Sequence, residues 1–225
     1  MSDSLSLHSG EYVERYVRKP LDRVRKLVDL MNIADAARIA DFACGNGMLL
    51  HALGERSGSY HGVDFSPDFI KAANAWARQE SPRHDSHFHC ADINAFCADN
   101  LASFDVACTL DFSEHVADAD AVPIYASIRS SLASGGRLYL HTPNAAFFME
   151  RAKDIGILRQ FPEHIAVRNA KDTVALLVAA GFPESGMTVR KIAHYNVLKL
   201  LHPLSKLPLI GPLFEARLLI EARIG

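Results

Sequence analysis

The sequence predicts an α/β fold with a doubly wound, mainly parallel seven-stranded sheet, helices on both faces and an antiparallel edge strand. Apolar segments of strand length alternate with helical segments five times, which is typical of parallel strands joined by crossover helices. Two closing strand-like segments have no full helix between them, which predicts the antiparallel edge. The chain has 225 residues, 49% of them hydrophobic, so it can form one domain with a buried core.

The elements follow in order along the chain. Residues 10–31 carry apolar side chains at helical spacing, and Pro20 divides them into two helices. Ser66 and Pro67 mark the start of a later helix, because serine favours the N-cap and proline the first helical position. Gly181 ends the last long helix. The expected strands are 38–43, 60–66, 86–93, 104–112, 137–144, 187–196 and 215–224, and the other expected helices are 45–56, 66–80, 121–136 and 171–182.

These elements are expected to form a single domain over residues 1–225. Residues 1–34 would be an N-terminal helical lid and 35–182 the ligand-binding core. Residues 183–225 would add the C-terminal strands, with an apolar insertion at 197–214. The domain therefore keeps its ligand chemistry in the central part of the chain.

Charge and cysteine content exclude several classes of protein. The formal net charge is −2, which argues against nucleic acid as a partner. The four cysteines, which are Cys44, Cys90, Cys97 and Cys108, form no CxxC pair and are expected to be reduced thiols. The first residues have no apolar signal core, and no apolar stretch is long enough to span a bilayer. A cytoplasmic protein is therefore expected.

Acidic residues end the first three expected strands. Asp41 precedes a turn with Gly45 and Gly47, where the backbone can approach a ligand closely. Asp64 ends the second strand, where a carboxylate can accept both hydroxyls of a ribose. Asp92 and Ile93 end the third strand, where they could meet an adenine amino group and ring face. Each residue alone is equally explained as a tight turn or a helix cap, but together they indicate a nucleoside site.

The set resembles the class I S-adenosylmethionine-dependent methyltransferases over roughly residues 35–182. Asp41–Gly47 is similar to their glycine-rich first motif, Asp64 to their ribose-binding acid, and Ala91–Ile93 to their adenine-side motif. Phe104–Val106, Glu114–Val116 and Leu132–Leu138 are similar to the later segments of that family. The resemblance implies a Rossmann-like fold and S-adenosyl-L-methionine as cofactor. It implies cofactor binding by Asp41, Ala43, Cys44, Gly45, Gly47, Asp64, Phe65, Asp92, Ile93 and Asp111.

Two positions depart from the family pattern. Ala43 replaces the usual first glycine, and we expect it to keep a negative φ with slightly tighter cofactor packing. Ser134 replaces the usual proline of a turn. A nicotinamide dehydrogenase is the competing prediction for this fold, but it needs a third glycine in the turn, and Met48–Leu50 follow Gly47 directly.

The segment LDFSEHV is the expected acceptor site. Asp111, Glu114 and His115 are spaced i, i+3 and i+4, so they would share a face on a helical turn. His115, with Glu114, is the candidate catalytic base for removing a hydroxyl proton. A similar segment in the ubiquinone-pathway O-methyltransferases binds a divalent cation, so the resemblance implies that Asp111, Glu114 and His115 could hold Mg²⁺. Many methyltransferases carry this segment and use no metal, and that alternative stays open.

Further residues are assigned to the acceptor by their positions. Tyr12 and Tyr16 lie on the N-terminal helix, His141 lies at the end of the fifth strand with Asn144 nearby, and His164 precedes the last crossover helix. Ordinary packing or local hydrogen bonds are the alternative for each of them. His87 and His89 would point the same way from a strand, which suits a metal or, more simply, a polar strand face.

The expected function is methyl transfer to a small-molecule acceptor, most simply to a hydroxyl oxygen. The acceptor is expected to be lipophilic or phenolic because the insertion 197–214 is apolar and rich in proline. That insertion could line an acceptor pocket, enter a membrane interface, form a dimer contact or pack in the core. The alternatives for function are an N- or C-methyltransferase acting on a metabolite or lipid headgroup, and a non-catalytic cofactor-binding or membrane-associated subunit.

Overall fold

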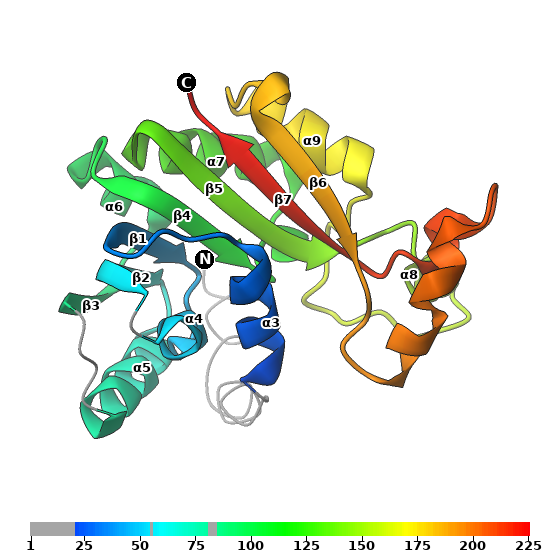
Figure 1. The fold of residues 1–225 in the computed structure, drawn as a ribbon, viewed down its shortest axis with the longest axis horizontal. Coiled ribbons are helices and arrows are strands. Elements are labelled where there is room, and N and C mark those ends of the chain that lie inside the picture. Colours follow the sequence, from blue (N-terminus) through cyan, green and yellow to red (C-terminus); the bar gives the residue numbers. More distant parts are fainter. Residues whose placement is uncertain (1–20, 55, 81–84) are drawn as a thin grey trace. The chain divides into compact units, whose positions relative to one another are not determined.

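The computed structural model describes residues 21–54, 56–80 and 85–225 (Figure 1). Seven strands form one sheet in the order β3-β2-β1-β4-β5-β7-β6. The described chain divides into two compact units, one with residues up to 109 and 130–137, the other with 110–129 and 138–225. The expected seven-stranded α/β fold is confirmed. Tyr12, Tyr16 and most of the expected N-terminal lid lie outside the described residues.

The first unit holds the parallel half of the sheet. Strand β1 (Ala37–Phe42) pairs in parallel with β2 (Ser57–Asp64) and with β4 (Phe104–Leu110), and β2 pairs in parallel with β3 (Asp85–Cys90). The helices of this unit are α3 (Asp22–Leu30), α4 (Met48–Leu53), α5 (Pro67–Glu80) and α6 (Ile93–Asp99). Parallel pairing places the carboxyl ends of these strands at one edge, so Asp41, Asp64 and the turn after Cys90 share that edge.

Helices cover both faces of this half-sheet. Successive side chains of β3 point in opposite directions, so neighbouring residues of this strand pack against helices on opposite faces. Phe88 packs on the side of α5, where a Cβ added at Gly47 would lie 2.9 Å from its ring. His89 packs on the opposite side, with its ring centroid 4.9 Å from that of Phe96 in α6. Strand β3 therefore has helices packed on both of its faces although it is the edge strand of this unit.

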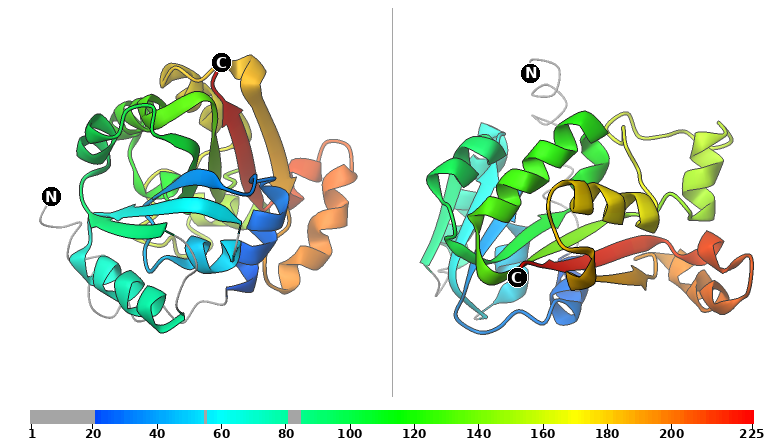
Figure 2. Two further views of the ribbon diagram at one scale, coloured as in Figure 1. Left: turned by 60° about the vertical axis from the view of Figure 1, so that its left-hand side comes forward. Right: turned by 90° about the horizontal axis from the view of Figure 1, so that it is seen from above.

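The second unit holds the antiparallel part. Strand β6 (Met187–Ile192) pairs antiparallel with β7 (Arg217–Arg223), and β5 (Leu132–Pro143) runs into this unit from the first. Its helices are α7 (Asp118–Ser131), α8 (Phe148–Asp154) and α9 (Ala170–Ala179). Figure 2 shows α7 and α9 as neighbours, and a Cβ added at Gly181, just after α9, would lie 3.5 Å from the Arg129 side chain of α7.

Several boundaries differ from the sequence prediction. Helices α6 and α8 have seven residues each, which is too short for a periodic apolar pattern, and neither was predicted. Strand β5 begins at Leu132 rather than at residue 137, because the two glycines expected to close the helix lie inside the strand. The predicted N-cap is confirmed, since the backbone N–H of Phe69 donates to Ser66 Oγ at 3.4 Å.

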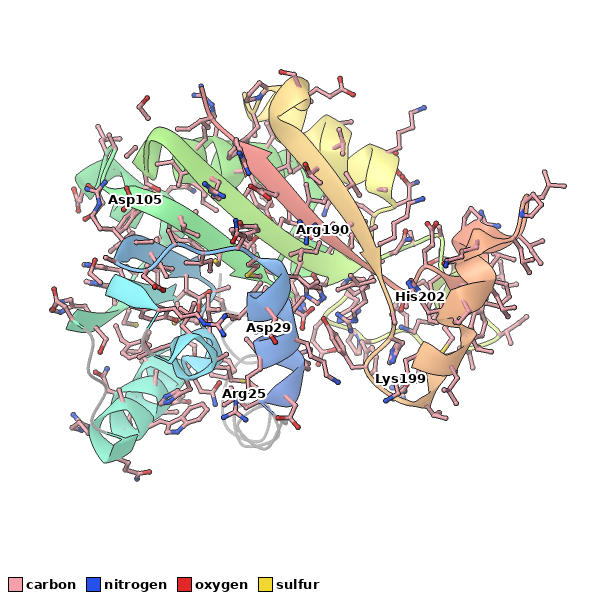
Figure 3. All side chains as sticks on the ribbon, in the orientation of Figure 1. Arg25, Asp29, Asp105, Arg190, Lys199 and His202 are labelled. Atoms are coloured by element: carbon pink, nitrogen blue, oxygen red, sulfur yellow. The ribbon has the colours of Figure 1, made fainter. Side chains whose placement is uncertain are left out.

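The insertion 197–214 forms two 3₁₀ helices, Val197–Lys206 and Gly211–Phe214. The core alternative is wrong for this segment, because Leu209 is 99% exposed and Val197 and Leu200 are each 70% exposed. Figure 3 shows Lys199 and His202 on its first helix. Prolines at 203, 208 and 212 remove backbone donors, which favours short 3₁₀ turns over a regular α-helix.

Candidate functional site

The glycine-rich turn after β1 runs through left-handed backbone conformations. Gly45 has φ 54° and Gly47 has φ 80°, and Ala43 has φ 56°. The expectation that Ala43 keeps a negative φ is therefore wrong. The turn imposes the glycine conformation on an alanine, which costs about 1–2 kcal/mol because Cβ approaches the carbonyl oxygen. The backbone path of the motif is thus retained despite the substitution.

Asp41 lies buried at the end of β1. Tyr60 of β2 donates its hydroxyl hydrogen to Asp41 Oδ2 at 2.6 Å. Burial is the main cause that raises the pKa of Asp41 to about 7; the Tyr60 hydrogen bond opposes this shift and the nearby charge of Asp64 adds to it. The neighbouring Cys44 is also buried, and burial raises its thiol pKa well above the ordinary value. Cys44 is therefore a neutral thiol in this turn.

Asp64 joins the ends of β1 and β2. Its Oδ2 accepts a hydrogen bond from the Gly45 N–H at 3.0 Å, and its Oδ1 accepts one from the Ser66 N–H at 2.9 Å. Neither contact caps helix α5, whose N-cap is Ser66, but together they hold the carboxylate at the strand edge. A carboxylate oxygen can accept more than one hydrogen bond, which is the property that a ribose-binding acid uses. Phe65 next to it is 42% exposed.

Asp92 is the N-cap of α6. Its Oδ1 accepts hydrogen bonds from the N–H groups of Asn94 (2.9 Å) and Ala95 (3.1 Å). Ile93, the first residue of the helix, is partly buried. Asp92 therefore acts as a helix cap, which was the alternative prediction for this residue. The cap holds the N-terminus of α6 beside the strand ends of the first unit.

In the second unit, Asp111 follows β4 with φ 55°. Its backbone N–H donates to the His141 carbonyl oxygen at 2.9 Å. Its Oδ1 lies 2.7 Å from Arg217 Nη1 and 2.9 Å from His141 Nδ1. The Tyr195 hydroxyl lies 2.8 Å from Nε2 of the same histidine. Backbone and side chain of Asp111 thus both hold His141, which is fully buried.

Glu114 and His115 lie on a 3₁₀ turn, Ser113–His115, rather than on an α-helical turn. Glu114 is 1% exposed, and Thr142 donates its hydroxyl hydrogen to Glu114 Oε2 at 3.1 Å. Burial raises the pKa of Glu114 to about 8, with the charge of Asp111 adding to the shift. The nearby Arg217 acts in the opposite direction. Burial of Glu114 therefore favours the protonated form of its side chain.

A second imidazole completes this cluster. His115 Nδ1 lies 2.8 Å from the Glu163 carbonyl oxygen, so Nδ1 carries the proton and Nε2 can accept one. The His115 and His164 ring centroids are 5.1 Å apart. Burial and the neighbouring His115 lower the pKa of His164 to about 4. Glu114, His115 and His164 each offer one ligand atom, and these atoms lie within 4.8 Å of one another. Asp111 is not part of this group.

Asn144 closes the turn after β5. Its amide Nδ2 donates to the Glu215 carbonyl oxygen at 2.8 Å, and its Oδ1 accepts from the Ala146 N–H at 3.1 Å. Both ends of the Asn144 amide therefore bond to the backbone, which agrees with the alternative prediction of local hydrogen bonds for this residue.

His87 and His89 of the first unit belong to a histidine group with His61, whose Nδ1 lies 3.1 Å from His89 Nε2.

Four polar residues of the second unit escaped the sequence analysis. Tyr195 and Arg217 contact His141 and Asp111, as described above, and Thr142 contacts Glu114. The Arg168 guanidinium donates to the carbonyl oxygens of Ser113 and Val116 at 2.7 Å each, which fixes the turn that carries Glu114. No local pattern marks these residues, because their partners are 28 to 106 residues away in the sequence. For Thr142, Tyr195 and Arg217, the available signal was a position at or near the end of a strand. Arg168 lies in the loop between α8 and α9 and carried no such signal.

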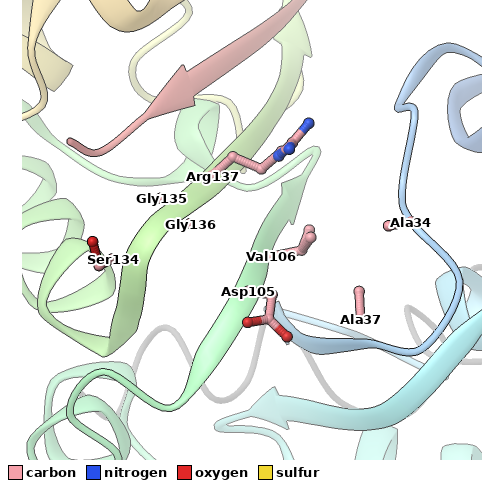
Figure 4. Close-up of a pocket in the computed structure, with 8 residues that line it drawn as sticks. All are labelled: Ala34, Ala37, Asp105, Val106, Ser134, Gly135, Gly136 and Arg137. Carbon is pink, nitrogen blue, oxygen red and sulfur yellow. The ribbon is translucent and has the colours of Figure 1, made fainter.

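A pocket in the first unit lies away from these strand ends. Ala34, Ala37, Asp105, Val106 and residues 134–137 line it (Figure 4). It adjoins the amino ends of β1 and β4, whereas ligands of such sheets bind beyond the carboxyl ends. Asp105 is bound there by Arg38 through two side-chain hydrogen bonds, of 2.7 and 3.0 Å. This pocket is therefore not the candidate site.

Comparison with known sequences identifies the class of domain. Residues 40–138 match the family described as "Methyltransferase domain", which assigns this segment to that family and confirms the expected class. The ubiquinone biosynthesis O-methyltransferase of Idiomarina loihiensis is 30% identical over 131 residues, covering 56% of this chain and 52% of the relative. The match thus spans about half the length of this curated relative, and the same holds for the others that share its name.

Solved structures confirm the fold. A SAM-dependent methyltransferase from Archaeoglobus fulgidus superimposes with a TM-score of 0.68 at 16% identity, covering 93% of this chain and 97% of that one. The magnesium protoporphyrin IX methyltransferase of Synechocystis PCC 6803, solved with bound SAH, gives a TM-score of 0.60 at 21% identity. That match covers 91% of this chain and 81% of the other.

Among the residues that the structure describes, no helix combines the length and apolar character needed to cross a bilayer.

Proposed function

We propose that the protein is an S-adenosyl-L-methionine-dependent methyltransferase that methylates a hydroxyl oxygen of a small molecule. The observation that carries this proposal is the methyltransferase-domain match of residues 40–138, whose strand ends bear Asp41, Asp64 and Asp92 in the family's order. Asp64 would receive the ribose hydroxyls, and the α6 N-terminus with Asp92 and Ile93 would adjoin the adenine. Phe65, Cys44 and the turn glycines would complete the cofactor contacts, with Asp111 as a further contact by resemblance.

Titration calorimetry with S-adenosylhomocysteine tests the cofactor. Micromolar binding to the wild type that is lost in Asp64→Ala is the expected result, because the ribose would lose its acceptor. Asp68→Ala is the matched control, since it removes an exposed acid two residues beyond the loop's Ser66. Absence of binding to the wild type, or equal losses in both variants, would contradict the proposal. NADH in the same cell tests the dehydrogenase alternative.

The choice of oxygen rests on the cluster of Glu114, His115 and His164. A hydroxyl acceptor must lose a proton as it attacks the methyl group, whereas the sulfonium already provides a good leaving group. The imidazole of His115 is suited to receive that proton. The pKa of His164, lowered to about 4, makes this second imidazole a weak base, so it would orient the acceptor instead. A lipophilic or phenolic acceptor fits the exposed apolar side chains around this unit. His164 and His141 would contact or orient it, and Asn144 would hold the adjoining turn.

The variant His115→Gln separates oxygen from nitrogen or carbon acceptors. Loss of the neutral-pH limb of the rate profile is expected if His115 removes the proton. An unchanged profile together with turnover of amine substrates would favour the N-methyltransferase alternative. Absence of turnover across hydroxyl, amine and activated-carbon acceptors, despite cofactor binding, would favour a non-catalytic subunit.

A divalent cation is the alternative use of this cluster, because a metal-bound His115 Nε2 could not also receive the acceptor proton. One carboxylate and two imidazoles suit a borderline ion such as Zn²⁺ better than Mg²⁺, which prefers oxygen ligands. Such an ion would be held by Glu114, His115 and His164, whereas the resemblance implied Asp111 as the third ligand. It would supply Lewis-acid polarisation of an acceptor oxygen. Metal analysis of the purified protein, compared with Glu114→Gln, tests binding independently of activity.

The insertion 197–214 is proposed as a peripheral contact with an anionic membrane surface, which would place this cytoplasmic enzyme near lipophilic acceptors. The segment contains Lys199 and Lys206 and no acid, although the whole chain has a net charge of −2. Exposed leucines on 3₁₀ turns can enter the interface without spanning the bilayer. A contact between two copies of the chain is the other candidate for the same surface.

Flotation with vesicles distinguishes these two contacts. Binding to vesicles that contain phosphatidylglycerol, reduced by the double change Leu200→Glu and Leu209→Glu, is the expected result. Leu101→Glu is the control, because Leu101 is 62% exposed in the other unit. Concentration-dependent dimerisation that the double change removes, without vesicle binding, would favour the contact between copies.

A further inference from the structure

Asn46 is a buried asparagine in the glycine-rich turn after β1. The residue is 1% exposed, and neither its amide Nδ2 nor its Oδ1 forms a hydrogen bond with any part of the chain that the structure describes. Buried polar groups of native proteins are nearly always paired, so an amide with both ends unpaired requires a partner.

The usual local roles of a turn asparagine do not explain this amide. Asparagine is favoured in turns because it tolerates left-handed backbone and because its side chain bonds to nearby backbone groups. Gly45 and Gly47 on either side have φ values of 54° and 80°, but Asn46 itself is not left-handed. Its side chain bonds to no backbone group, and the N-cap of α4 is Gly47. The partner of the amide is therefore expected to be a ligand.

The turn that carries Asn46 adjoins the strand ends assigned to the nucleoside. Strands β3, β2 and β1 are neighbours in the sheet in this order (Figure 1). Asp92 follows β3 and Asp64 ends β2, and Asp64 Oδ2 accepts a hydrogen bond at 3.0 Å from the N–H of Gly45, the residue before Asn46. Adenine at Asp92 and ribose at Asp64 would set the direction of the cofactor across these strands. The next part of the cofactor, its amino acid end, would then meet the turn after β1.

The chemistry of an amide matches that end of the cofactor. Asparagine has a donor, Nδ2, and an acceptor, Oδ1. The α-amino acid end of S-adenosyl-L-methionine carries an ammonium group, which only donates, and a carboxylate, which only accepts. A neutral amide can pair with both groups and adds no buried charge of its own.

We propose that the Asn46 side chain binds the α-amino acid end of the cofactor, with Oδ1 accepting from the ammonium group and Nδ2 donating to the carboxylate. This inference rests on the cofactor and on the ribose position at Asp64 that were proposed above. The glycines give the turn its path, and the side chain between them supplies selectivity. Asn46 favours a nucleoside that carries an amino acid over one that ends near the sulfur.

Titration calorimetry with three nucleosides tests this role without any methyl acceptor. S-adenosylhomocysteine carries the ammonium group and the carboxylate, its decarboxylated analogue carries only the ammonium group, and 5′-methylthioadenosine carries neither. All three retain the adenine, the ribose and the sulfur. A contact with the amino acid end therefore affects their affinities to different extents, whereas support of the turn affects all three alike.

Asn46→Ala should weaken the binding of S-adenosylhomocysteine by about tenfold to a hundredfold, which is the effect of losing hydrogen bonds to charged groups. It should weaken the decarboxylated analogue less and leave the affinity for 5′-methylthioadenosine unchanged, which also shows that the variant is folded. Asn74→Ala is the matched control, because that amide already donates to the Ile70 carbonyl oxygen within α5 at 2.9 Å. The control should change none of the three affinities.

Asn46→Asp provides a second test that keeps the size of the side chain. Its carboxylate still accepts from the ammonium group but repels the carboxylate of the ligand. The preference for S-adenosylhomocysteine over its decarboxylated analogue should therefore fall or be reversed. A purely structural role of the amide would weaken both ligands equally.

Two results would overturn the inference and leave the proposed function standing. Equal losses for S-adenosylhomocysteine and 5′-methylthioadenosine in Asn46→Ala would show that the amide only supports the turn. Unchanged affinity for S-adenosylhomocysteine in both Asn46 variants would show that the amide does not contact the ligand. A wild type that binds none of the three nucleosides would instead overturn the proposed cofactor, and this inference with it.

Discussion

At the scale of the residue, Ala43 shows how a turn imposes its conformation on the side chain it carries. Its φ of 56° falls in the region that glycine adopts without cost. The alanine methyl group is therefore a source of strain in a position where its neighbours Gly45 and Gly47 are also left-handed. The strain is local, so a single substitution should release it.

Ala43→Gly should raise the free energy of unfolding by up to about 1 kcal/mol, because release of left-handed strain exceeds the added entropy of the unfolded chain. Urea denaturation measures this change. Ala40→Gly in β1 is the control, since Ala40 is buried in a regular strand and the change should destabilise the protein. Equal destabilisation by both changes would contradict the strain at Ala43.

Glu114 gives a prediction about pH. Its pKa rises from an ordinary 4.5 to about 8 in the folded state, so the unfolded chain releases this proton first. Its contribution to stability is complete below about pH 4.5 and is lost as pH rises toward 8. Glu114→Gln should therefore stabilise the protein relative to wild type more at pH 8 than at pH 5. Urea midpoints at both values test this, and a constant difference would show that Glu114 is already ionised in the folded protein.

At the scale of the element, the short helix α6 depends on its cap. Asp92 satisfies two of the free N–H groups at the start of a helix of seven residues. Such a helix has few intrahelical bonds of its own, so its position at the strand edge depends on this cap and on Phe96 packed against His89. The same residue is proposed to adjoin the adenine.

Asp92→Ala should lower the free energy of unfolding by about 1 kcal/mol, whereas Asp92→Asn should retain most of it because asparagine is also a good N-cap. Chemical denaturation of both variants tests the cap. Affinity for S-adenosylhomocysteine, measured on the same pair, separates the cap from ligand binding. Full affinity in both variants would leave Asp92 with a capping role alone.

At the scale of the whole molecule, cofactor binding should be visible as stability. A ligand that binds only the folded state stabilises it by about 2.7 kcal/mol when its concentration is one hundred times its Kd. Thermal unfolding should therefore shift upward with S-adenosylhomocysteine in the wild type and in Asp68→Ala, but not in Asp64→Ala. A shift of equal size in Asp64→Ala would contradict the role of Asp64 in ribose binding.

The sequence by itself determined the order of strands and helices, because apolar periodicity, serine and proline at helix starts and glycine at helix ends are local signals. It also located the acids at the strand ends, since parallel strands bring their carboxyl ends to one edge. It could not reveal α6 and α8, which are too short for a periodic pattern. It gave Ala43 the wrong sign of φ, because the turn and not the residue sets that angle.

Only the tertiary structure decided which polar groups meet. Asp111 was expected beside Glu114 and His115 by helical spacing, but a left-handed residue and a 3₁₀ turn direct it to Arg217 and His141 instead. The residues that contact His141 follow other strands, and Tyr195 is 54 residues away in the chain, so no local pattern records these contacts. Burial, which raises the pKa of Glu114 and lowers that of His164, likewise arises only when the distant segments pack together.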